Sequence, residues 1–440
     1  KILPFKARMG WTLPWYSSYA DDINEEPRPV RVRLSSVPPS SAVCSTVLSC
    51  VSHCQGAYAA VPPEGPPMKT RAAVMTTPGK DWEITELELA PPQAGEVLVR
   101  FTHAGLCFSD EHVRTGNMAP LPIIGGHEGS GIVEAVGEGV SKLAPGDHVA
   151  ASFKPSCGHC RWCASGRSNL CDAAAFGPEG KLPDGTYRFT GPDGPIGANC
   201  SLGTFAEHSV VSQDSLVRVD PDIPLSVVAL VSCGVLTGWG AAVYAADPEP
   251  GDTVIVVGAG GVGINAVQGA RLSGAGNIIL VDPNEAKHAL ARDLGASHVC
   301  RTLDEAAALA ADLNPSAGGA DSTLVCTGET TADIVRAAFE ATGKGGTIVL
   351  AGMTEDVHAI NVQLPGTQLV FAEKRLQGTI FGSCSPIRDV PRVLSLYRQG
   401  LIKLDELVSR TYSLDEINQG FEDLRSGRNL RGVVAHGPAQ

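Results

Sequence analysis

The sequence predicts an α/β protein in which a doubly wound domain is inserted between two parts of a mostly-β domain. Up to about residue 234, stretches such as EVLVRFTHAGLC, GIVEAVGEGV and GDHVAASF alternate apolar and polar residues between glycines and prolines, which is typical of short antiparallel strands. Beyond PEPGD, the β-branched runs TVIVV, NIILVD, STLVCTG and GTIVLAG alternate with alanine-rich stretches such as NEAKHALARDLGA. This second pattern indicates a parallel sheet covered by helices. From about residue 380 the pattern becomes mixed again.

These changes of pattern predict the domain boundaries. We expect a mostly-β domain over residues 68–234, a doubly wound domain over 235–379, and a return to the first domain over 380–440. Residues 1–67 are rich in proline and serine and show no sustained period, so we expect a disordered extension ahead of a natural start at Met68. The same segment contains a group that resembles a metal cluster but is expected to be incidental: Cys44, Cys50, His53 and Cys54.

Composition narrows the class of protein. The chain has 440 residues, a hydrophobic content of 43% and a formal charge of −13, which argues against a main role in binding nucleic acid or anionic membranes. No run is expected to reach the eighteen or more apolar residues that span a bilayer, so we expect a soluble protein. The 13 cysteines are too sparse for a disulfide scaffold and are unevenly placed, which favours metal sites in a reducing compartment such as the cytoplasm.

A glycine-rich turn follows the first strand of the doubly wound domain. In TVIVVGAGGVGINAVQGA, Gly258, Gly260 and Gly263 follow the G-x-G-x-x-G spacing between a strand and a helix. The first glycine permits the turn, the second lets the backbone approach a pyrophosphate, and the third lets the helix pack on the strand. Asp282 ends the next strand, where a carboxylate accepts hydrogen bonds from a ribose and repels a 2′-phosphate. The pattern predicts a Rossmann domain that binds NAD in preference to NADP.

Four cysteines are crowded into CGHCRWCASGRSNLC. Cys157, Cys160, Cys163 and Cys171 follow a C-x2-C-x2-C-x7-C spacing, whose last gap is longer than in bacterial ferredoxins and is not followed by proline. This arrangement favours a structural zinc site with four thiolate ligands over the two alternatives, an iron–sulfur cluster and disulfide bonds.

A second group of metal-binding residue types is spread along the chain. GLCFSDEH contains Cys107, GGHEGSG contains His127, and VSCGVLTGWG contains Cys233. Two thiolates and one imidazole would leave the fourth position of a zinc ion open for water or substrate. Spacing alone does not show that the three residues meet, and a buried structural cysteine is the alternative for each thiol.

Several of these stretches together resemble the zinc-containing medium-chain alcohol dehydrogenases, from Met68 to about Val434. The resemblance rests on GHE, the four-cysteine lobe, DGTYRF, LGTFAEH, CGVLTGWG, GAGGVG and LRSGRNLRG. MKTRAAV, IIGGHEGSGIVEAVG, CGHCRWCASGRSNLCD and LDEINQG are more narrowly similar to the actinobacterial enzymes named for their dependence on the dye N,N-dimethyl-4-nitrosoaniline (NDMA). Those nicotinoproteins keep NAD bound and pass electrons to an external acceptor, for which a mycofactocin-like peptide cofactor is proposed.

The resemblance implies a GroES-like catalytic domain, two zinc ions per subunit and oxidation of primary alcohols to aldehydes. Cys107, His127 and Cys233 would bind the catalytic zinc, and Asp110 and Glu128 would support its ligands. The zinc would lower the pKa of the alcohol, and a hydride would pass to NAD. Ser109 would take the released proton and relay it through the nicotinamide ribose to His112 near the surface.

The resemblance also implies the coenzyme contacts. They are Gly258, Gly260, Gly261, Val262 and Gly263 at the turn, Asp282 and Lys287 at the adenosine ribose, Arg431 at the pyrophosphate, and Thr237, Ala351, Met353, Thr379 and Phe381 around the nicotinamide. Phe108 departs from the family, which often has Arg or His there to touch the pyrophosphate. Phe153 is expected to wall the alcohol pocket.

Two alternatives to an alcohol dehydrogenase stay open at this point. One is a formaldehyde dehydrogenase that acts on a hydroxymethyl–thiol adduct, which would need an anion-binding residue at the mouth of the pocket. The other is a catalytically silent NAD-binding scaffold. The resemblance further implies a homodimer or homotetramer formed edge to edge by the coenzyme domains, with a small alcohol or aldehyde as substrate.

Overall fold

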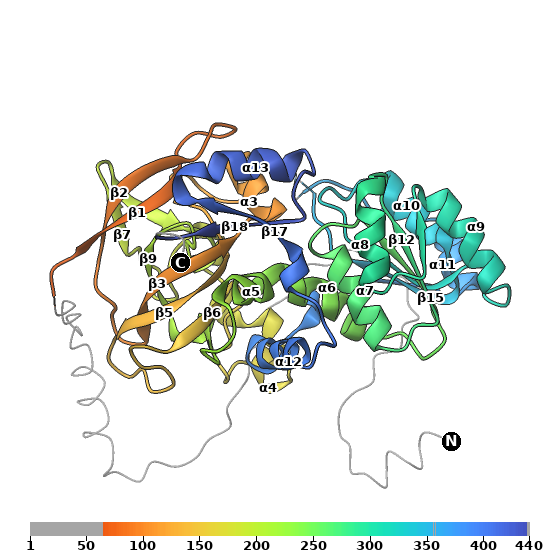
Figure 1. Ribbon diagram of the computed structural model, residues 1–440, viewed down its shortest axis with the longest axis horizontal. Coiled ribbons are helices and arrows are strands. Elements are labelled where there is room, and N and C mark those ends of the chain that lie inside the picture. Colours follow the sequence, from red (N-terminus) through yellow and green to blue (C-terminus); the bar gives the residue numbers. More distant parts are fainter. Residues whose placement is uncertain (1–64, 355, 357, 438–440) are drawn as a thin grey trace, which may run out of the picture. The chain divides into compact units, whose positions relative to one another are not determined.

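The computed structural model describes residues 65–437 except 355 and 357. The expected extension and its Cys44, Cys50, His53 and Cys54 group therefore lie outside the described residues, apart from residues 65–67. Two β-rich assemblies and one parallel sheet account for the strands of the described part (Figure 1).

The mostly-β domain consists of a closed barrel and a larger sheet. The barrel has the order β1 (Met68–Met75), β2 (Glu83–Leu89), β7 (Phe189–Gly191), β8 (Gly194–Ala198) and β4 (Ile123–Ile124). The sheet has the order β10 (Leu216–Val219), β6 (His148–Ser152), β5 (Glu128–Val136), β3 (Glu96–Gly105), β18 (Arg431–Ala435) and β17 (Val408–Ser413), with β9 (His208–Ser212) also paired to β3. Because β18 pairs with β3, the end of the chain returns to the domain in which the described residues begin.

The doubly wound domain has six parallel strands. Their order is β13 (His298–Cys300), β12 (Asn277–Val281), β11 (Thr253–Val257), β14 (Ala320–Val325), β15 (Thr342–Leu350) and β16 (Arg375–Gly378). All five residues of β11 are buried: Val254 and Val256 join a core with α7 (Gly263–Leu272), whereas Ile255 and Val257 join a second core with α9 (Leu303–Leu313). Burial on both faces explains why this strand reads as a continuous apolar run.

The remaining α-helices of the described part are 4–13 residues long. They are α3 (Phe108–Arg114), α4 (Arg161–Ala164), α5 (Leu225–Leu230), α6 (Leu236–Gly240), α8 (His288–Asp293), α10 (Ala332–Ala341), α11 (Gly366–Phe371), α12 (Pro386–Arg398) and α13 (Ile417–Arg425). Helix α3 carries three of the predicted site residues, and α13 leads into the loop before β18.

A continuous helical run, Leu225–Ala246, contains α5 and α6 and passes across the boundary expected between residues 234 and 235. It is 22 residues long with a mean hydropathy of 1.8, so the expectation that no stretch reaches membrane-spanning length and hydrophobicity is wrong. The window is 89% buried inside the protein, and Val228, Leu236 and Trp239 lie in the largest core cluster. A helix that is apolar on all sides is typical of the centre of a large protein as well as of a membrane.

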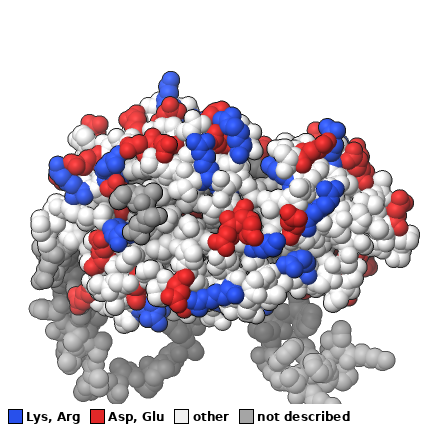
Figure 2. Space-filling model, viewed as in Figure 1, with Lys and Arg blue, Asp and Glu red and all other residues white. Residues whose placement is uncertain are grey.

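On the face shown in Figure 2, basic and acidic side chains are mixed and form no large patch of one sign. Several basic residues are paired with carboxylates, as in Arg398 with Asp220 at 2.8 Å and Arg71 with Asp415 at 2.6 Å. Such exposed pairs contribute little to stability, about 0–1 kcal/mol each.

Candidate functional site

Four residues from three distant parts of the sequence converge from the N-terminal end of α3, the beginning of β5 and the long apolar helix. The donor atoms of Cys107, His127, Glu128 and Cys233 all lie within 4.8 Å of one another, and all four residues are buried. Two sulfurs, one imidazole nitrogen and a carboxylate within this distance form a set that fits a single zinc ion.

Asp110 positions the imidazole of this set. The Asp110 Oδ1 atom lies 3.0 Å from His127 Nδ1 and also accepts from Gly126 N and Asn199 Nδ2, both at 3.0 Å. The contact leaves His127 Nε2 as the nitrogen available to a metal. Burial opposes protonation of His127, but the Asp110 carboxylate and the Cys107 thiolate outweigh it and raise the pKa of the imidazole well above its ordinary value.

The two thiols differ in their tendency to ionise. A hydrogen bond from Cys233 holds the pKa of Cys107 well below its ordinary value against the effect of burial, and the same contact together with burial raises the pKa of Cys233. Buried oxygens of the neighbouring acids, Asp110 Oδ2 and Glu128 Oε1, have no hydrogen-bond partner among the described residues. Negative charge and unpartnered acceptors around the set are what a bound cation would neutralise.

Glu128 has a partner that the sequence did not indicate. Arg431, which the resemblance placed at the pyrophosphate, is buried and donates from Nη2 to Glu128 Oε2. Burial raises the pKa of Glu128 to about 7, although Arg431 acts in the opposite direction. The Arg431 Nε atom is buried without an acceptor in the described part, and a Cβ at Gly261 would lie 2.4 Å from Arg431 Cδ. Arg431 thus joins the metal-binding group to the glycine turn and keeps one donor for a phosphate.

A cavity of about 720 Å³ connects the glycine turn to this group. Its lining contains the predicted residues Cys107, Ser109, His112, Gly258, Gly260, Gly261, Val262, Asp282, Lys287, Ala351, Met353 and Arg431. Thr237, Gly263, Thr379 and Phe381 are described but do not line it. Gly263 instead packs α7 against the turn, because a Cβ there would lie 1.7 Å from Gly258 O.

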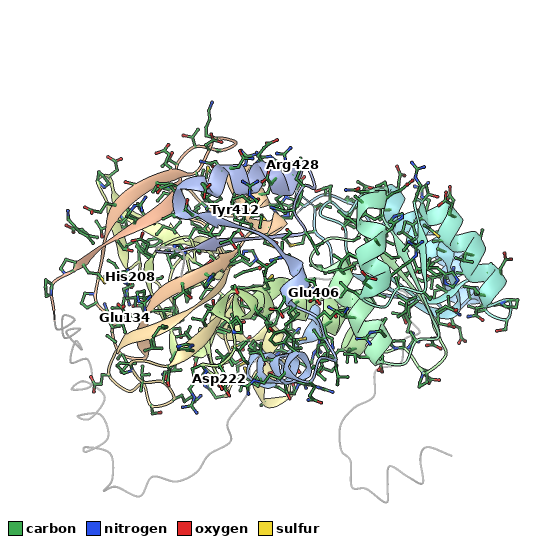
Figure 3. All side chains as sticks on the ribbon, in the orientation of Figure 1. Glu134, His208, Asp222, Glu406, Tyr412 and Arg428 are labelled. Atoms are coloured by element: carbon green, nitrogen blue, oxygen red, sulfur yellow. The ribbon has the colours of Figure 1, made fainter. Side chains whose placement is uncertain are left out.

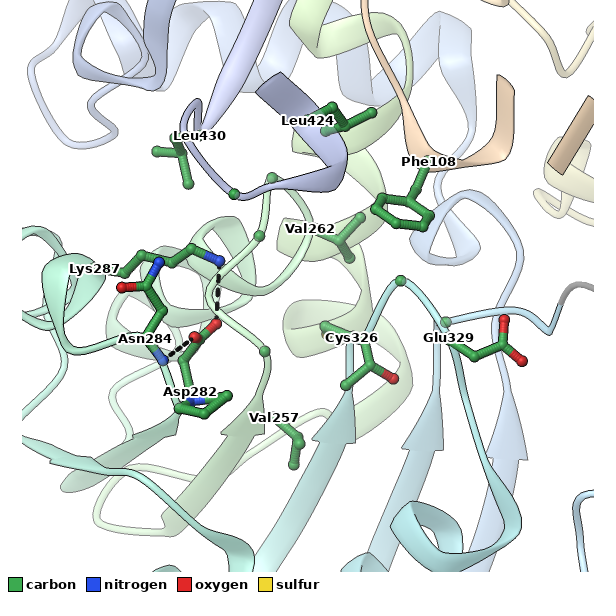
Figure 4. Close-up of a pocket in the computed structure, with 18 of the residues that line it drawn as sticks. Phe108, Val257, Val262, Asp282, Asn284, Lys287, Cys326, Glu329, Leu424 and Leu430 are labelled. Carbon is green, nitrogen blue, oxygen red and sulfur yellow. Dashed lines mark hydrogen bonds and ion pairs between the residues drawn. The ribbon is translucent and has the colours of Figure 1, made fainter. Parts of the chain in front are cut away.

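Figure 4 shows the acidic end of the cavity. The Asp282 carboxylate accepts from Ala259 N at 2.8 Å and from Asn284 N at 2.9 Å, and Lys287 Nζ lies 3.4 Å away. Asp282 therefore stabilises the glycine turn itself, in addition to any contact with a ribose. Phe108, Val262, Leu424 and Leu430 form an apolar border on the other side of the cavity.

His112 is not placed as expected. The residue was expected near the surface, but it is only 5% exposed. Its Nε2 atom lies 3.3 Å from Gly328 O, and the residue borders the cavity rather than open solvent. Ser109 Oγ lies 3.7 Å from Cys107 Sγ, which brings the hydroxyl to the edge of the metal-binding group.

The sequence reasoning missed several residues of the cavity. Asn284, Cys326, Gly328, Glu329, Leu424 and Arg425 line it without having been singled out. Cys326 and Gly328 could have been predicted from the sequence, because they follow the buried parallel strand β14. Ligands bind beyond the carboxyl ends of such strands. Leu424 and Arg425 come from α13, which only tertiary structure brings here.

The loop after α13 is fixed by a carboxylate. Asp423 accepts from Tyr412 Oη at 2.7 Å and from Arg428 Nε at 2.8 Å (both labelled in Figure 3). The Tyr412 hydrogen bond, followed by that of Arg428, lowers the pKa of Asp423 to about 2. This anchor positions the residues up to Arg431 that border the cavity.

The four-cysteine lobe forms a second group. The sulfurs of Cys157, Cys160, Cys163 and Cys171 lie within 4.8 Å of one another, with Cys157–Cys163 and Cys160–Cys171 both at 3.9 Å. The edge of a tetrahedron with Zn–S bonds of about 2.3 Å is about 3.8 Å, so the spacing fits one zinc ion. All four cysteines are free, which excludes the disulfide alternative in this structure. The pKa of Cys160 is lowered to about 6, mainly because its sulfur accepts a hydrogen bond from the backbone N–H of Cys163.

The lobe also contacts the segment around Phe381. Ser168 Oγ donates to Ser385 Oγ at 2.6 Å, and Asn169 Nδ2 donates to Ile380 O at 3.3 Å. These bonds flank Phe381, whose ring packs edge-on against Phe153 at 5.2 Å. Phe153 in turn lies 5.6 Å from the His127 ring. The lobe thus supports an aromatic wall next to the metal-binding group.

A methyl group added at two glycines of the turn should separate folding from coenzyme binding. At Gly263 the added atom would collide with Gly258 O, so Gly263→Ala is expected to destabilise the fold by about 3 kcal/mol. At Gly260 nothing lies within 4 Å, so Gly260→Ala should unfold at the wild-type temperature but bind NAD at least about tenfold more weakly. Thermal unfolding and calorimetric titration with NAD measure the two effects. If Gly260→Ala bound NAD with wild-type affinity, the pyrophosphate would not lie against the backbone at Gly260.

Comparisons with known proteins agree on the family. Residues 93–221 match the alcohol dehydrogenase GroES-like domain, and residues 261–399 match the zinc-binding dehydrogenase domain. The chain is 50% identical over 370 residues to the NDMA-dependent alcohol dehydrogenase of Amycolatopsis methanolica, covering 84% of this chain and 99% of that protein. It is 40% identical over 372 residues to alcohol dehydrogenase B of Mycobacterium tuberculosis, covering 84% and 99%.

Solved structures show the same architecture. The benzyl alcohol dehydrogenase of Acinetobacter calcoaceticus has a TM-score of 0.77 and 33% identity, covering 84% of this chain and 100% of that one. A zinc-binding dehydrogenase from Sinorhizobium meliloti, solved with NADP, has a TM-score of 0.67 and 25% identity, covering 84% and 99%. The predicted fold class, a doubly wound coenzyme domain with a GroES-like catalytic domain, is confirmed.

Proposed function

The chain belongs to the zinc-dependent medium-chain alcohol dehydrogenase family, and from this membership we propose that it oxidises primary alcohols to aldehydes with an NAD molecule that stays bound between turnovers. The observation that carries the proposal is the cavity that runs from Asp282 past the glycine turn to Cys107. It brings a coenzyme site and a candidate zinc site into one space. A silent scaffold would have no need of a complete ligand set at the end of that cavity.

Two zinc ions per subunit are part of this proposal. One would be held by Cys107, His127 and Cys233, and the other by the four-cysteine lobe. When bound, the first zinc would polarise the alcohol oxygen, and NAD would accept the hydride. Asp110 would keep His127 in the tautomer that binds metal, and Arg431 would hold Glu128 beside the ligands.

Proton release would use two residues of α3. Ser109 lies beside Cys107, where its hydroxyl can accept a proton from the alcohol and pass one on. His112 borders the same cavity and would receive the proton through the nicotinamide ribose. Because His112 is buried against Gly328, the cavity would be the proton's way out to solvent.

NAD is proposed over NADP because Asp282 stands at the ribose end of the cavity. A carboxylate there repels a 2′-phosphate. Its hydrogen bonds from Ala259 and Asn284 hold it in place. The phosphate contact that Phe108 does not supply would come from Arg431, and the apolar border of Phe108, Leu424 and Leu430 would bury the coenzyme and slow its release.

The decisive experiment follows the coenzyme of the purified protein. Gel filtration followed by denaturation should release about one nicotinamide dinucleotide per subunit, and alcohol oxidation should proceed with NDMA as acceptor but not with added NAD. Gly260→Ala is the matched control, since it should fold but lose the bound coenzyme. A wild-type protein that emerges free of coenzyme and turns over with added NAD would overturn the retained-NAD proposal while leaving the dehydrogenase in place.

The proposal also covers the electron acceptor, the cellular location and the oligomeric state of the enzyme. The physiological acceptor would be a mycofactocin-like molecule, and the location the cytoplasm, where the free thiols of the described cysteines would stay reduced. A homodimer or homotetramer is proposed from the edge of the parallel sheet, where β16 pairs on one side only within the described part and where Val370 and Phe371 are 69% and 85% exposed. Light scattering that gave the monomer mass would exclude this assembly.

A further inference from the structure

Lys154 is a half-buried lysine whose ammonium group has no partner of opposite charge among residues 65–437 as the structure describes them. Within the described residues its Nζ atom forms no hydrogen bond or ion pair, and its one specific contact is with the Phe153 ring, 5.6 Å from the centroid. Burial lowers the pKa of Lys154, while the nearby thiols of Cys200 and Cys171 act in the opposite direction. A desolvated cation without a carboxylate is costly unless something else compensates it.

Two routes connect Lys154 to the candidate zinc site. Along the chain it follows Phe153, whose ring packs edge-on against His127 at 5.6 Å. Across space it lies near Cys200, whose Sγ donates to Asn199 Oδ1 at 3.5 Å, and Asn199 Nδ2 donates to Asp110 Oδ1. His127 and Asp110 are buried, whereas Phe153, Lys154 and Cys200 are half-buried and border accessible space. Lys154 is therefore adjacent, through Phe153, to the candidate zinc ligands, and it is on the half-buried side of that ring.

We propose that Lys154 binds an anionic group of the substrate, so that the enzyme prefers alcohols that carry a carboxylate or a phosphate at the end remote from the hydroxyl. The proposal rests on the proposed function and adds the substrate class to it. The hydroxyl would lie at the zinc ligands, the carbon chain along Phe153 and the anion on Lys154. A charge-assisted hydrogen bond in a partly desolvated place is stronger than one between neutral groups.

A purely structural role makes a different prediction. Lys154 lies near Cys171 of the four-cysteine lobe, so its charge could instead balance the thiolates of that lobe. In that case its loss would lower the zinc content and the unfolding temperature, and it would reduce the oxidation of all alcohols equally. Substrate selectivity and zinc content thus distinguish the two roles.

The test compares three substrates of equal chain length on the holoenzyme: an ω-hydroxycarboxylate, an ω-hydroxyalkyl phosphate and a 1-alkanol. Wild type should show a higher kcat/KM on at least one anionic alcohol than on the 1-alkanol. Lys154→Met keeps the apolar stem and should lower kcat/KM on that anionic alcohol by about tenfold to a hundredfold, with the 1-alkanol within about twofold. Lys154→Arg should retain most of the preference, and Lys154→Glu should abolish it.

Lys374→Met is the matched control. Lys374 also stacks on an aromatic ring, 4.3 Å from the Phe339 centroid, but it belongs to the parallel-sheet domain, so its loss should leave all three substrates unchanged. A preference for only the carboxylate or only the phosphate supports the proposal and identifies the group. Equal losses on charged and neutral alcohols, a loss of zinc, or no effect of Lys154→Met overturns it. Oxidation of the 1-alkanol without any preference for charge refutes this inference alone, whereas oxidation of no alcohol refutes the proposed function as well.

Discussion

Replacing His127 with asparagine is expected to lower kcat for alcohol oxidation by roughly a thousandfold, equivalent to about 4 kcal/mol of transition-state stabilisation. The imidazole lies within 4.8 Å of both thiols and is oriented by Asp110, so its loss would leave two sulfurs and a misplaced carboxylate around the metal. The measurement is steady-state kinetics together with zinc content, which should fall from two ions to one per subunit.

His103→Asn provides the control for this prediction. His103 is a half-buried histidine of the neighbouring strand β3, and it lies outside the metal-binding group. Its replacement should leave two zinc ions bound per subunit. It should also keep kcat within about twofold of the wild-type value, as expected for a substitution away from the site. If His127→Asn kept two zinc ions and most of its activity, Cys107, His127 and Cys233 would not be the catalytic ligands.

Replacing Cys160 with serine is expected to remove the second zinc and destabilise the catalytic domain by several kcal/mol, because structural zinc binding supplies folding free energy directly. The four sulfurs lie at the spacing of ligands to one ion, and no residue of α4 within the lobe is buried, so burial does not replace the contribution of the metal. Thermal unfolding with and without a chelator measures the effect: the wild-type midpoint should fall on chelation, and that of Cys160→Ser should already be low and should not change.

The same variant should lose activity indirectly. Ser168 and Asn169 bond the lobe to Ser385 and Ile380, next to the Phe381 ring that packs on Phe153, so a disordered lobe would loosen the aromatic wall. Cys300→Ser is the control, since Cys300 is a free cysteine in β13 of the parallel sheet and should leave the chelator response intact. A Cys160→Ser protein with wild-type stability would show that the lobe holds no structural metal.

Local sequence predicted those parts of the site whose residues are close in the chain. The glycine turn needs only a strand, six residues and a helix, and the structure shows Gly258 at a φ of 95° with Gly263 against its carbonyl oxygen. The cysteine lobe closes within fifteen residues, so its spacing alone brings the sulfurs together. In both cases the chain has little conformational freedom between the residues that must meet.

Predictions from the sequence failed or were incomplete where the burial of a residue depends on segments that are distant in the chain. His112 was expected near the surface as the last residue of the proton relay, but it is buried, with Nε2 3.3 Å from Gly328 O. The apolar run Leu225–Ala246 is buried because strands and helices from both domains surround it. The resemblance placed Arg431 at the pyrophosphate, and the structure adds a partner that the sequence did not indicate, the buried carboxylate of Glu128 in β5.

By itself, the sequence determined the alternation of strands and helices, the coenzyme turn and the four-cysteine lobe, because each depends on periodicity or on contacts within a few turns of chain. Only the tertiary structure decided that Cys107, His127 and Cys233 meet, that Arg431 connects them to the turn, and that Phe153, on which Lys154 stacks, packs against His127. Such contacts depend on how whole sheets pack, and that packing is set by the summed burial of many apolar side chains rather than by the few residues that form the site.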